Sequence, residues 1–326
     1  MSKRLLIAVF AALASSASVQ ATDNILVASS RSNSIEEFNT SGTWLRTFAT
    51  TGPYAPVALA QSPITGEIFV TTMSASGPSA GQLTNKILRY HQTGKFDVDW
   101  DTFTVACGSC PTAQTQSLLF DSSGDLWVAT AYGTDAGGPI YILKYLAADL
   151  ALPNPPAVAS PIMTNMYRGD QMAFNASGNL CIAGFIDEDV KCFDTSTGAQ
   201  TADYYGEIHA SSISPVIEPV GLAFDGANRM YLTSVFGGQL ARELKPDGPI
   251  VPLATLIPQL DGNLVLHGGN LYTTTYNVSP LTFSTPDPVY EVSISSGAVT
   301  KFIYGTAPPA LGNDHIWGAS WMIFYF

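Results

Sequence analysis

The sequence predicts an all-β protein, a six-bladed β-propeller whose blades are four-stranded antiparallel sheets. Its apolar runs are short, rich in Val, Ile, Leu, Phe, Tyr and Thr, and broken by turn residues, and no window of a dozen residues carries a helical stripe. One unit recurs along the chain: an apolar run, a polar break around Gly or Asn, and a second apolar run. Successive copies lie 43 to 60 residues apart, which leaves room for four short strands in each.

The first 21 residues have the three parts of a secretory signal peptide and are expected to lie outside the fold. Lys3 and Arg4 form the basic start, the apolar run LLIAVFAALA follows, and small residues lead to Ala21. Residues 22–326 are then expected to form a single propeller domain that is exported, either to the periplasm or to the extracellular medium.

The composition argues against nucleic-acid and membrane partners. Without the leader, the chain has 12 Lys and Arg against 26 Asp and Glu, a net charge of about −14 that repels phosphate groups. No later apolar run reaches the roughly 18 residues that a membrane helix requires. With 46% hydrophobic and 11% aromatic residues, the chain can bury a large core, and we expect a soluble monomer.

The copies place the strands of each blade in a regular order. The first, innermost run is marked in successive copies by Val57, Ser117, Gln171, Val220 and Asn263, with a shorter match at Ile316. The second runs align as EIFV, DLWV, NLCI, RMYL and NLYT, and their third residues form one column: Phe69, Trp127, Cys181, Tyr231 and Tyr272. Such a column is expected to pack one blade on the next. Third runs such as KILRYHQTG follow, closed by Gly-containing turns.

The two ends of the chain are expected to complete one blade together. Residues 24–49 match the second, third and fourth runs of a blade but lack a first, whereas residues 316–326 supply a first run alone. Pairing the N-terminal strands with the C-terminal strand closes the ring and removes the exposed sheet edges that an open ring would leave.

The stretch RSNSIEEFNTSGTWLRTF, residues 31–48, resembles the NHL repeat. The family pattern places an Asn, an Ile, an aromatic residue, a Gly and a final Phe in this order, and it is matched by Asn33, Ile35, Phe38, Gly42 and Phe48. Ser32 and Ser34 stand where the family prefers His, Arg or Asn, and the other copies match more loosely. The resemblance implies a propeller and says little about chemistry, because propellers host unrelated functions.

Four cysteines in an exported chain allow three pairings. Cys181 lies in the second run and Cys192 in the third run of one copy, so the two are expected to face each other across a hairpin in a structural disulfide. Cys107 and Cys110 form CGSC in a connection between copies. They are expected to form a local disulfide that pins this loop, because redox pairs usually open a helix; a thiol redox pair is the alternative.

Polar residues recur just before or at the start of the inner strands, where the connections of a propeller converge on the central channel. They are Tyr54; Gln114 and Gln116; Arg168 and Asp170; Glu218; Asp261 and Asn263; and Asn313, Asp314 and His315. Of these, the expected ligand contacts are Gln116, Arg168, Asn313 and His315. The alternative is that the polar groups only face solvent or hydrogen-bond the ends of crowded inner strands.

Four carboxylates of this set come from separate copies: Asp170, Glu218, Asp261 and Asp314. With Asn263 or Asn313, they offer the hard oxygen ligands that Ca²⁺ takes from separate loops. The arrangement is similar to that of the calcium-dependent lactonases among gluconolactonase-like propellers, which implies a central metal that polarises a carbonyl while a side chain activates water. The N-terminal Glu-Gly-Pro element of that family is missing here, so the similarity is one of position.

Two functions stay open on these observations. The first is a recognition module whose channel-mouth face binds a glycan, a peptide or a small molecule. The second is a calcium-dependent hydrolase or lyase, with His315 or Arg168 as the catalytic candidates and Ca²⁺ as the one cofactor that the pattern suggests. Because no Gly-rich phosphate loop, HExxH or GxSxG motif occurs, the recognition module is favoured.

Overall fold

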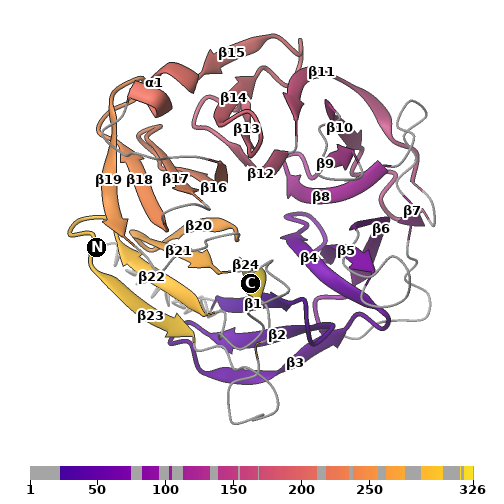
Figure 1. Cartoon of the computed structure of the whole chain (residues 1–326). Coiled ribbons are helices and arrows are strands. Elements are labelled where there is room, and N and C mark those ends of the chain that lie inside the picture. The colour runs from indigo at the N-terminus through magenta and orange to yellow at the C-terminus, as the bar shows by residue number, and fades with distance from the viewer. Residues whose placement is uncertain are drawn as a thin grey trace, which may run out of the picture.

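Six antiparallel sheets of four strands each are arranged around a central axis as the blades of a propeller, which confirms the predicted fold (Figure 1). The computed structural model describes residues 23–74, 83–94, 103–104, 113–132, 139–152, 155–167, 169–210, 218–234, 238–255, 262–275, 288–303, 316 and 319–325. Within these residues, no helix has the length and hydropathy that a membrane-spanning helix requires.

The strands of each blade follow one another from the channel outward. Blade 1 consists of β24 (Ala319–Tyr325), β1 (Asn24–Ser29), β2 (Ser34–Asn39) and β3 (Trp44–Thr50). Blade 2 consists of β4 (Tyr54–Gln61), β5 (Ile68–Ser74), β6 (Leu83–Tyr90) and β7 (Phe103–Thr104). Blade 3 consists of β8 (Ala113–Phe120), β9 (Leu126–Tyr132), β10 (Pro139–Tyr145) and β11 (Val158–Tyr167).

The second half of the ring repeats this order. Blade 4 consists of β12 (Gly169–Phe174), β13 (Leu180–Gly184), β14 (Asp189–Phe193) and β15 (Gln200–Asp203). Blade 5 consists of β16 (Pro219–Phe224), β17 (Met230–Ser234), β18 (Gln239–Glu243) and β19 (Ile250–Thr255). Blade 6 consists of β20 (Leu264–His267), β21 (Asn270–Thr274), β22 (Val289–Ser293) and β23 (Val299–Ile303). A short helix that the sequence did not predict, α1 (Tyr205–Ala210), follows β15.

Blade 1 is closed by the two ends of the chain, as predicted. β24 pairs with β1 in antiparallel register, from Tyr325 opposite Asn24 to Trp321 opposite Ala28. A polar network around the buried carboxylate of Glu37 ties the two ends further, because this carboxylate accepts hydrogen bonds from the Tyr325 hydroxyl, the Asn24 amide and the Arg46 guanidinium. The β24 and β1 strands therefore hold the ring shut through both backbone and side-chain bonds.

The recurring polar break of the sequence is a tight turn closed by its own first side chain. In blade 3, Asp121 accepts hydrogen bonds from the backbone N–H groups of Ser123 and Asp125, at 2.9 and 3.0 Å. In blade 4, Asn175 does the same for Ser177 and Asn179, both at 3.0 Å. A residue with positive φ completes such turns, which is why Gly or Asn recurs there.

The predicted column of large side chains lies between the blades. Phe69 of blade 2 packs edge-to-face on Phe120 of blade 3, with ring centroids 5.2 Å apart. The same arrangement joins Trp127 to Phe174 at 6.4 Å, and Tyr272 to Phe324 at 5.0 Å. Each of these column residues thus meets an aromatic residue near the end of the next inner strand, a contact worth about 0.5–1.5 kcal/mol beyond the apolar area that it buries.

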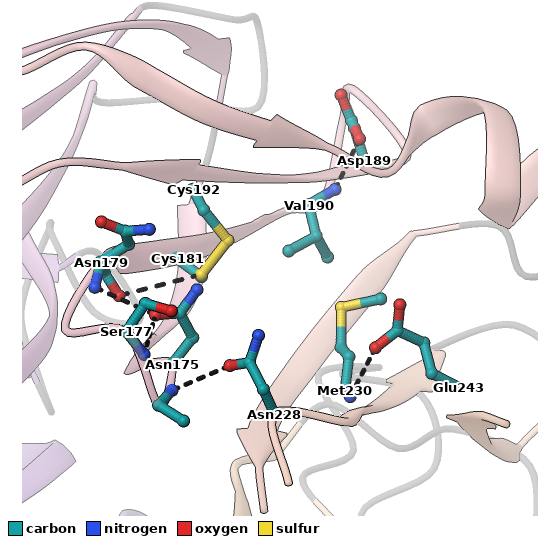
Figure 2. Close-up of a disulfide and its surroundings, with 11 residues drawn as sticks. Asn175, Ser177, Asn179, Cys181, Asp189, Val190, Cys192, Asn228, Met230 and Glu243 are labelled. Carbon is teal, nitrogen blue, oxygen red and sulfur yellow. Dashed lines mark hydrogen bonds between the residues drawn. A yellow bond between two sulfur atoms is a disulfide. The ribbon is translucent and has the colours of Figure 1, made fainter. Parts of the chain in front are cut away.

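A charged residue stands opposite the column residue on the third strand in every blade except blade 4. In blade 1 the equivalent position of the second strand is Leu26, the third residue of β1. The register pairs are Leu26 with Glu37, Phe69 with Arg89, Trp127 with Lys144, Tyr231 with Arg242, and Tyr272 with Glu291. In blade 4 the two positions hold Cys181 and Cys192, which form the predicted disulfide and are fully buried (Figure 2). The disulfide therefore replaces the pair of long side chains that the other blades use.

Loss of this disulfide should lower the stability of the whole propeller. In the variant with Cys181→Ala and Cys192→Ala, we expect the free energy of unfolding to fall by about 3 kcal/mol, because the bond closes a loop with a sequence separation of 11. Denaturant unfolding with and without reductant is the measurement. The fully reduced parent should match the double variant, and equal midpoints for the oxidised parent and the variant would contradict the structural role.

Candidate functional site

The candidate site is the channel mouth, the end of the ring at which the inner strands begin. Each blade repeats the same meander, so the connections from an outer strand to the next inner strand come to one face, together with the turns between second and third strands. The tight turns closed by Asp121 and Asn175 lie on the opposite face. Of the residues that the sequence singled out before the inner strands, Gln116, Asp170 and Glu218 are among those described, and they belong to this face of the molecule.

Gln116 of β8 and Asp170 of β12 meet at the mouth, although they belong to different blades. The side-chain amide of Gln116 donates a hydrogen bond to one carboxylate oxygen of Asp170, a residue that is only 6% exposed. The carbonyl oxygen of Gln116 is buried and accepts no hydrogen bond from the described residues. The pair can present acceptor oxygens to a ligand that brings hydrogen-bond donors.

Glu218 lies directly before β16, the inner strand that follows β12 around the ring. Its backbone has a φ of +72°, a left-handed conformation that is uncommon for a residue with a long side chain and costs about 1 kcal/mol or more. The residue is partly buried. Blades 4 and 5, which are adjacent, therefore each have a carboxylate at the mouth, Asp170 and Glu218. Gly or Asn would fit the backbone at position 218 better than Glu does.

Tyr54, the first residue of β4, has a basic partner that the sequence analysis missed. The ammonium of Lys86 donates a hydrogen bond of 2.8 Å to the Tyr54 hydroxyl and lies 5.0 Å from the ring centroid. Lys86 comes from the third strand of the same blade. Only the strand register, and not the spacing along the chain, brings the two together.

Asn263 has a structural role and does not serve as a ligand at the mouth. The residue is 1% exposed, its amide nitrogen donates to the Met322 carbonyl at 2.7 Å, and its oxygen accepts the Met322 N–H at 2.9 Å. Both polar atoms of the side chain are therefore used to tie blade 6 to the inner strand of blade 1. The alternative weighed from the sequence, that these polar groups bond the inner strands, is correct for this residue.

Gln171 makes the most extensive connection between inner strands. Its side-chain oxygen accepts the N–H groups of Leu222 and Leu264, at 2.9 and 2.8 Å, and its nitrogen donates to the Leu264 carbonyl at 2.9 Å. One amide group from blade 4 thus bonds the inner strands of blades 5 and 6. The sequence marked this position as the start of a strand and did not reveal its bonds.

Gln171, Asn263, Ser117 and Ser320 together form a set that we call the inner belt. The hydroxyl of Ser117 accepts the Met172 N–H at 3.4 Å, and the hydroxyl of Ser320 donates to the Pro56 carbonyl at 3.0 Å. Two mouth residues directly precede belt residues, because Gln116 is followed by Ser117 and Asp170 by Gln171. The hydrogen bonds of the inner belt therefore fix the backbone next to Gln116 and Asp170. A preorganised binding site requires such support.

The other predicted site residues lie outside the described residues. These are Arg168, Asp261, Asn313, Asp314 and His315, together with Gln114 as a side chain and the cysteines Cys107 and Cys110. In the part of the chain that the structure describes, no three His, Cys, Asp or Glu side chains are grouped so that they could hold a metal ion. The calcium site and the second disulfide stay predictions.

Two histidines of the described residues lie on different faces of the molecule. His267 ends β20 on the opposite face, where its ring stacks on Phe324 with centroids 3.8 Å apart and an interplanar angle of 9°. His209 belongs to α1, and its ring lies 4.0 Å from that of Tyr205. His267 is therefore on the face away from the mouth, whereas His209 lies on the mouth face, beside the outer strand of blade 4.

No protein-family model and no curated protein matches this chain. Solved structures do match. A chain of a nidogen/laminin complex superposes with a TM-score of 0.62 at 12% identity, over 93% of this chain and 98% of that chain. A streptogramin B lyase gives 0.53 at 13% identity over 89% and 80%, and a candidate gluconolactonase gives 0.52 at 14% over 78% and 86%. At these identities the matches show a shared propeller fold with neighbours of varied function.

Proposed function

We propose that this protein is an exported recognition module, periplasmic or extracellular, whose channel-mouth face binds a glycan, a peptide or a small molecule. The observation that carries the proposal is the bonded pair of Gln116 and Asp170, held at the mouth by the belt residues that follow them. A buried disulfide is consistent with export, since such bonds persist in oxidising compartments. The similarity to a chain from a nidogen/laminin complex fits a binding role.

Binding can be tested with glycan and peptide arrays, followed by affinity measurements on the best ligand. Asp170→Asn and Gln116→Leu should each weaken binding tenfold or more, because each removes an acceptor or a donor from a water-poor site. The matched control is Ser123→Ala, an exposed residue in a tight turn of the opposite face. If all three variants lose the same affinity for the ligand, or if only the control loses affinity, the binding surface lies elsewhere.

A calcium-dependent hydrolase or lyase is the second candidate, favoured by the carboxylates that adjacent blades keep at the mouth, Asp170 and Glu218. In the full proposal, Asp261 and Asp314 complete the ligand set, and Arg168 or His315 acts on the substrate. The four carboxylates fit a Ca²⁺ ion by ligand type, since all are oxygen donors. Asp170 is the second residue of β12 and Glu218 directly precedes β16, and these two inner strands are neighbours in the ring.

The calcium site predicts that the parent melts several degrees higher in Ca²⁺ than in chelator. The double variant Asp170→Asn with Glu218→Gln should lose this difference, while the Asn side chain can still accept the hydrogen bond from Gln116. A lactone and ester hydrolysis screen on the calcium-loaded parent then distinguishes catalysis from binding. Identical melting of the parent in both solutions would rule the metal site out and leave the recognition module.

A further inference from the structure

The helix α1 and the turn between β13 and β14 form a charged contact on the mouth face of blade 4. α1 joins β15 to the connection, residues 211–217, that leads to Glu218. Its inner side is apolar: Ile208 of the helix and Tyr204, the residue directly before it, are 2% and 4% exposed and pack in one cluster with Cys192. Its C-terminal end contacts Glu188 of the turn, and its N-terminal end is linked through Asp203 and Lys191 to Asp189, the first residue of β14.

The N-terminal end of α1 is connected to Asp189 through two other charged residues. Asp203 accepts a hydrogen bond of 3.2 Å from the Tyr205 N–H and so caps the helix. The Lys191 ammonium lies 4.0 Å from the Asp203 carboxylate and 3.4 Å from that of Asp189. One cation is therefore shared between the carboxylate that caps α1 and the buried carboxylate beneath it.

The C-terminal end of α1 contacts the neighbouring residue of the turn. His209 lies 3.5 Å from the Glu188 carboxylate, and this contact is an ion pair only when the imidazole is protonated. The Glu188 backbone has a φ of +54°, and the equivalent four-residue turn of blade 1 holds Asn33 at the same φ. Asn suits this conformation and Glu does not, so the chain keeps a less favourable residue where its carboxylate reaches α1.

Asp189 is 2% exposed, and its carboxylate accepts the Val190 N–H at 2.7 Å (Figure 2). Burial raises the pKa of Asp189 to about 6, the negative charge of Asp203 acts in the same direction, and Lys191 lowers it. In the described residues, the charged groups around it are Asp187 and Glu188 of the turn, Lys191 of β14, Asp203 of β15 and His209 of α1. Undocking of α1 and β15 would hydrate Asp189 and remove Asp203 from it.

We propose that α1 is a proton-dependent latch, docked on blade 4 most tightly at acidic pH, with Asp189 as the sensing group. The docked state holds the proton of Asp189 more tightly than the undocked state, whose pKa falls back toward the ordinary value of 3.8. Docking is therefore favoured at low pH, weakens as the pH rises through about 6, and then levels off.

The test is amide hydrogen exchange of α1 and β15 in the full chain, measured at pH 5.0 and at pH 7.5 and corrected for intrinsic exchange. The difference between a pKa of about 6 and the ordinary 3.8 limits the change in the docking equilibrium to roughly 100-fold, and we expect about 10-fold or more between the two pH values. The amides of β21 in blade 6 serve as the internal reference. Equal protection of α1 at both pH values would overturn the proposal.

Asp189→Asn is the decisive variant, because Asn can still accept the Val190 N–H but does not titrate. In this variant the amides of α1 should stay protected from hydrogen exchange at both pH values. If their protection still changes with pH, Asp189 is not the sensor. Asp203→Asn keeps a capping oxygen and removes the repulsion, so it should shrink the pH response even if Asp189→Asn folds poorly. The matched control is Glu243→Gln in blade 5. Glu243 is also fully buried, and burial raises the pKa of its carboxyl to about 7. This substitution should leave the pH dependence of α1 protection unchanged.

Discussion

Deletion of residues 319–326 should abolish folding of the propeller. The deletion removes the strand that pairs with β1 and takes away the buried side chains of Trp321, Met322 and Tyr325. Each large buried side chain contributes about 1.5–3 kcal/mol. The deletion also leaves Asn263 without both of its backbone partners. Together these losses are comparable with the whole stability of a domain, about 5–15 kcal/mol. We expect aggregation and no cooperative thermal transition by circular dichroism.

A circular permutant controls for the removal of sequence as such. Because Tyr325 lies opposite Asn24, a short linker can join residues 326 and 23, while new ends are opened in the exposed turn at Ser295 and Ser296. This chain keeps every pairing of blade 1 and should fold with a melting temperature near that of the parent. A folded deletion variant would show that β24 is dispensable and that the ring is held shut by other contacts.

Gln171→Met should destabilise the protein by roughly 3–9 kcal/mol. The substitution keeps the length of the side chain but leaves the N–H groups of Leu222 and Leu264 and the Leu264 carbonyl without their partner. Each unsatisfied buried polar group costs about 1–3 kcal/mol. The effect is large because Gln171 bonds the inner strands of two other blades. Denaturant unfolding gives the change in free energy directly.

The control for this substitution is Gln61→Met, at the C-terminal end of β4, where the residue is partly exposed and its amide nitrogen bonds a turn carbonyl at 3.3 Å. Water can replace that bond, so the control should cost less than about 1 kcal/mol. If the two variants lose equal stability, the connection of three blades through Gln171 contributes no more than an ordinary surface hydrogen bond.

The architecture could be predicted from the sequence because it depends on features that repeat. The column at Phe69 and Trp127, the turn chemistry at Asp121 and the pairing of Cys181 with Cys192 each occupy an equivalent position in successive copies. Closure followed from the first run that the N-terminal segment lacks and that the C-terminal segment supplies. Repetition gives several independent observations of the same local structure, so errors in one copy do not change the prediction.

The site was predicted less completely, because its contacts join residues that the pattern does not relate. Gln171 bonds Leu264 at a sequence separation of 93, and Lys86 reaches Tyr54 at a separation of 32. Asn263 looked like a ligand from its place before an inner strand, and only its two bonds to Met322 show that it belongs to the belt. α1 was missed because six residues are too few to display a helical period.

The way in which blade 1 is closed also determines how the molecule should respond to mechanical force. Tyr325 and Asn24 are register partners, so a load applied between these two residues pulls on the β1–β24 ladder from one end. Its hydrogen bonds would then break one after another, as in unzipping, instead of sharing the load as they do in shear. The ring of six packed blades should thus open at low tension when it is pulled by both ends, whereas attachment through one end would leave it intact.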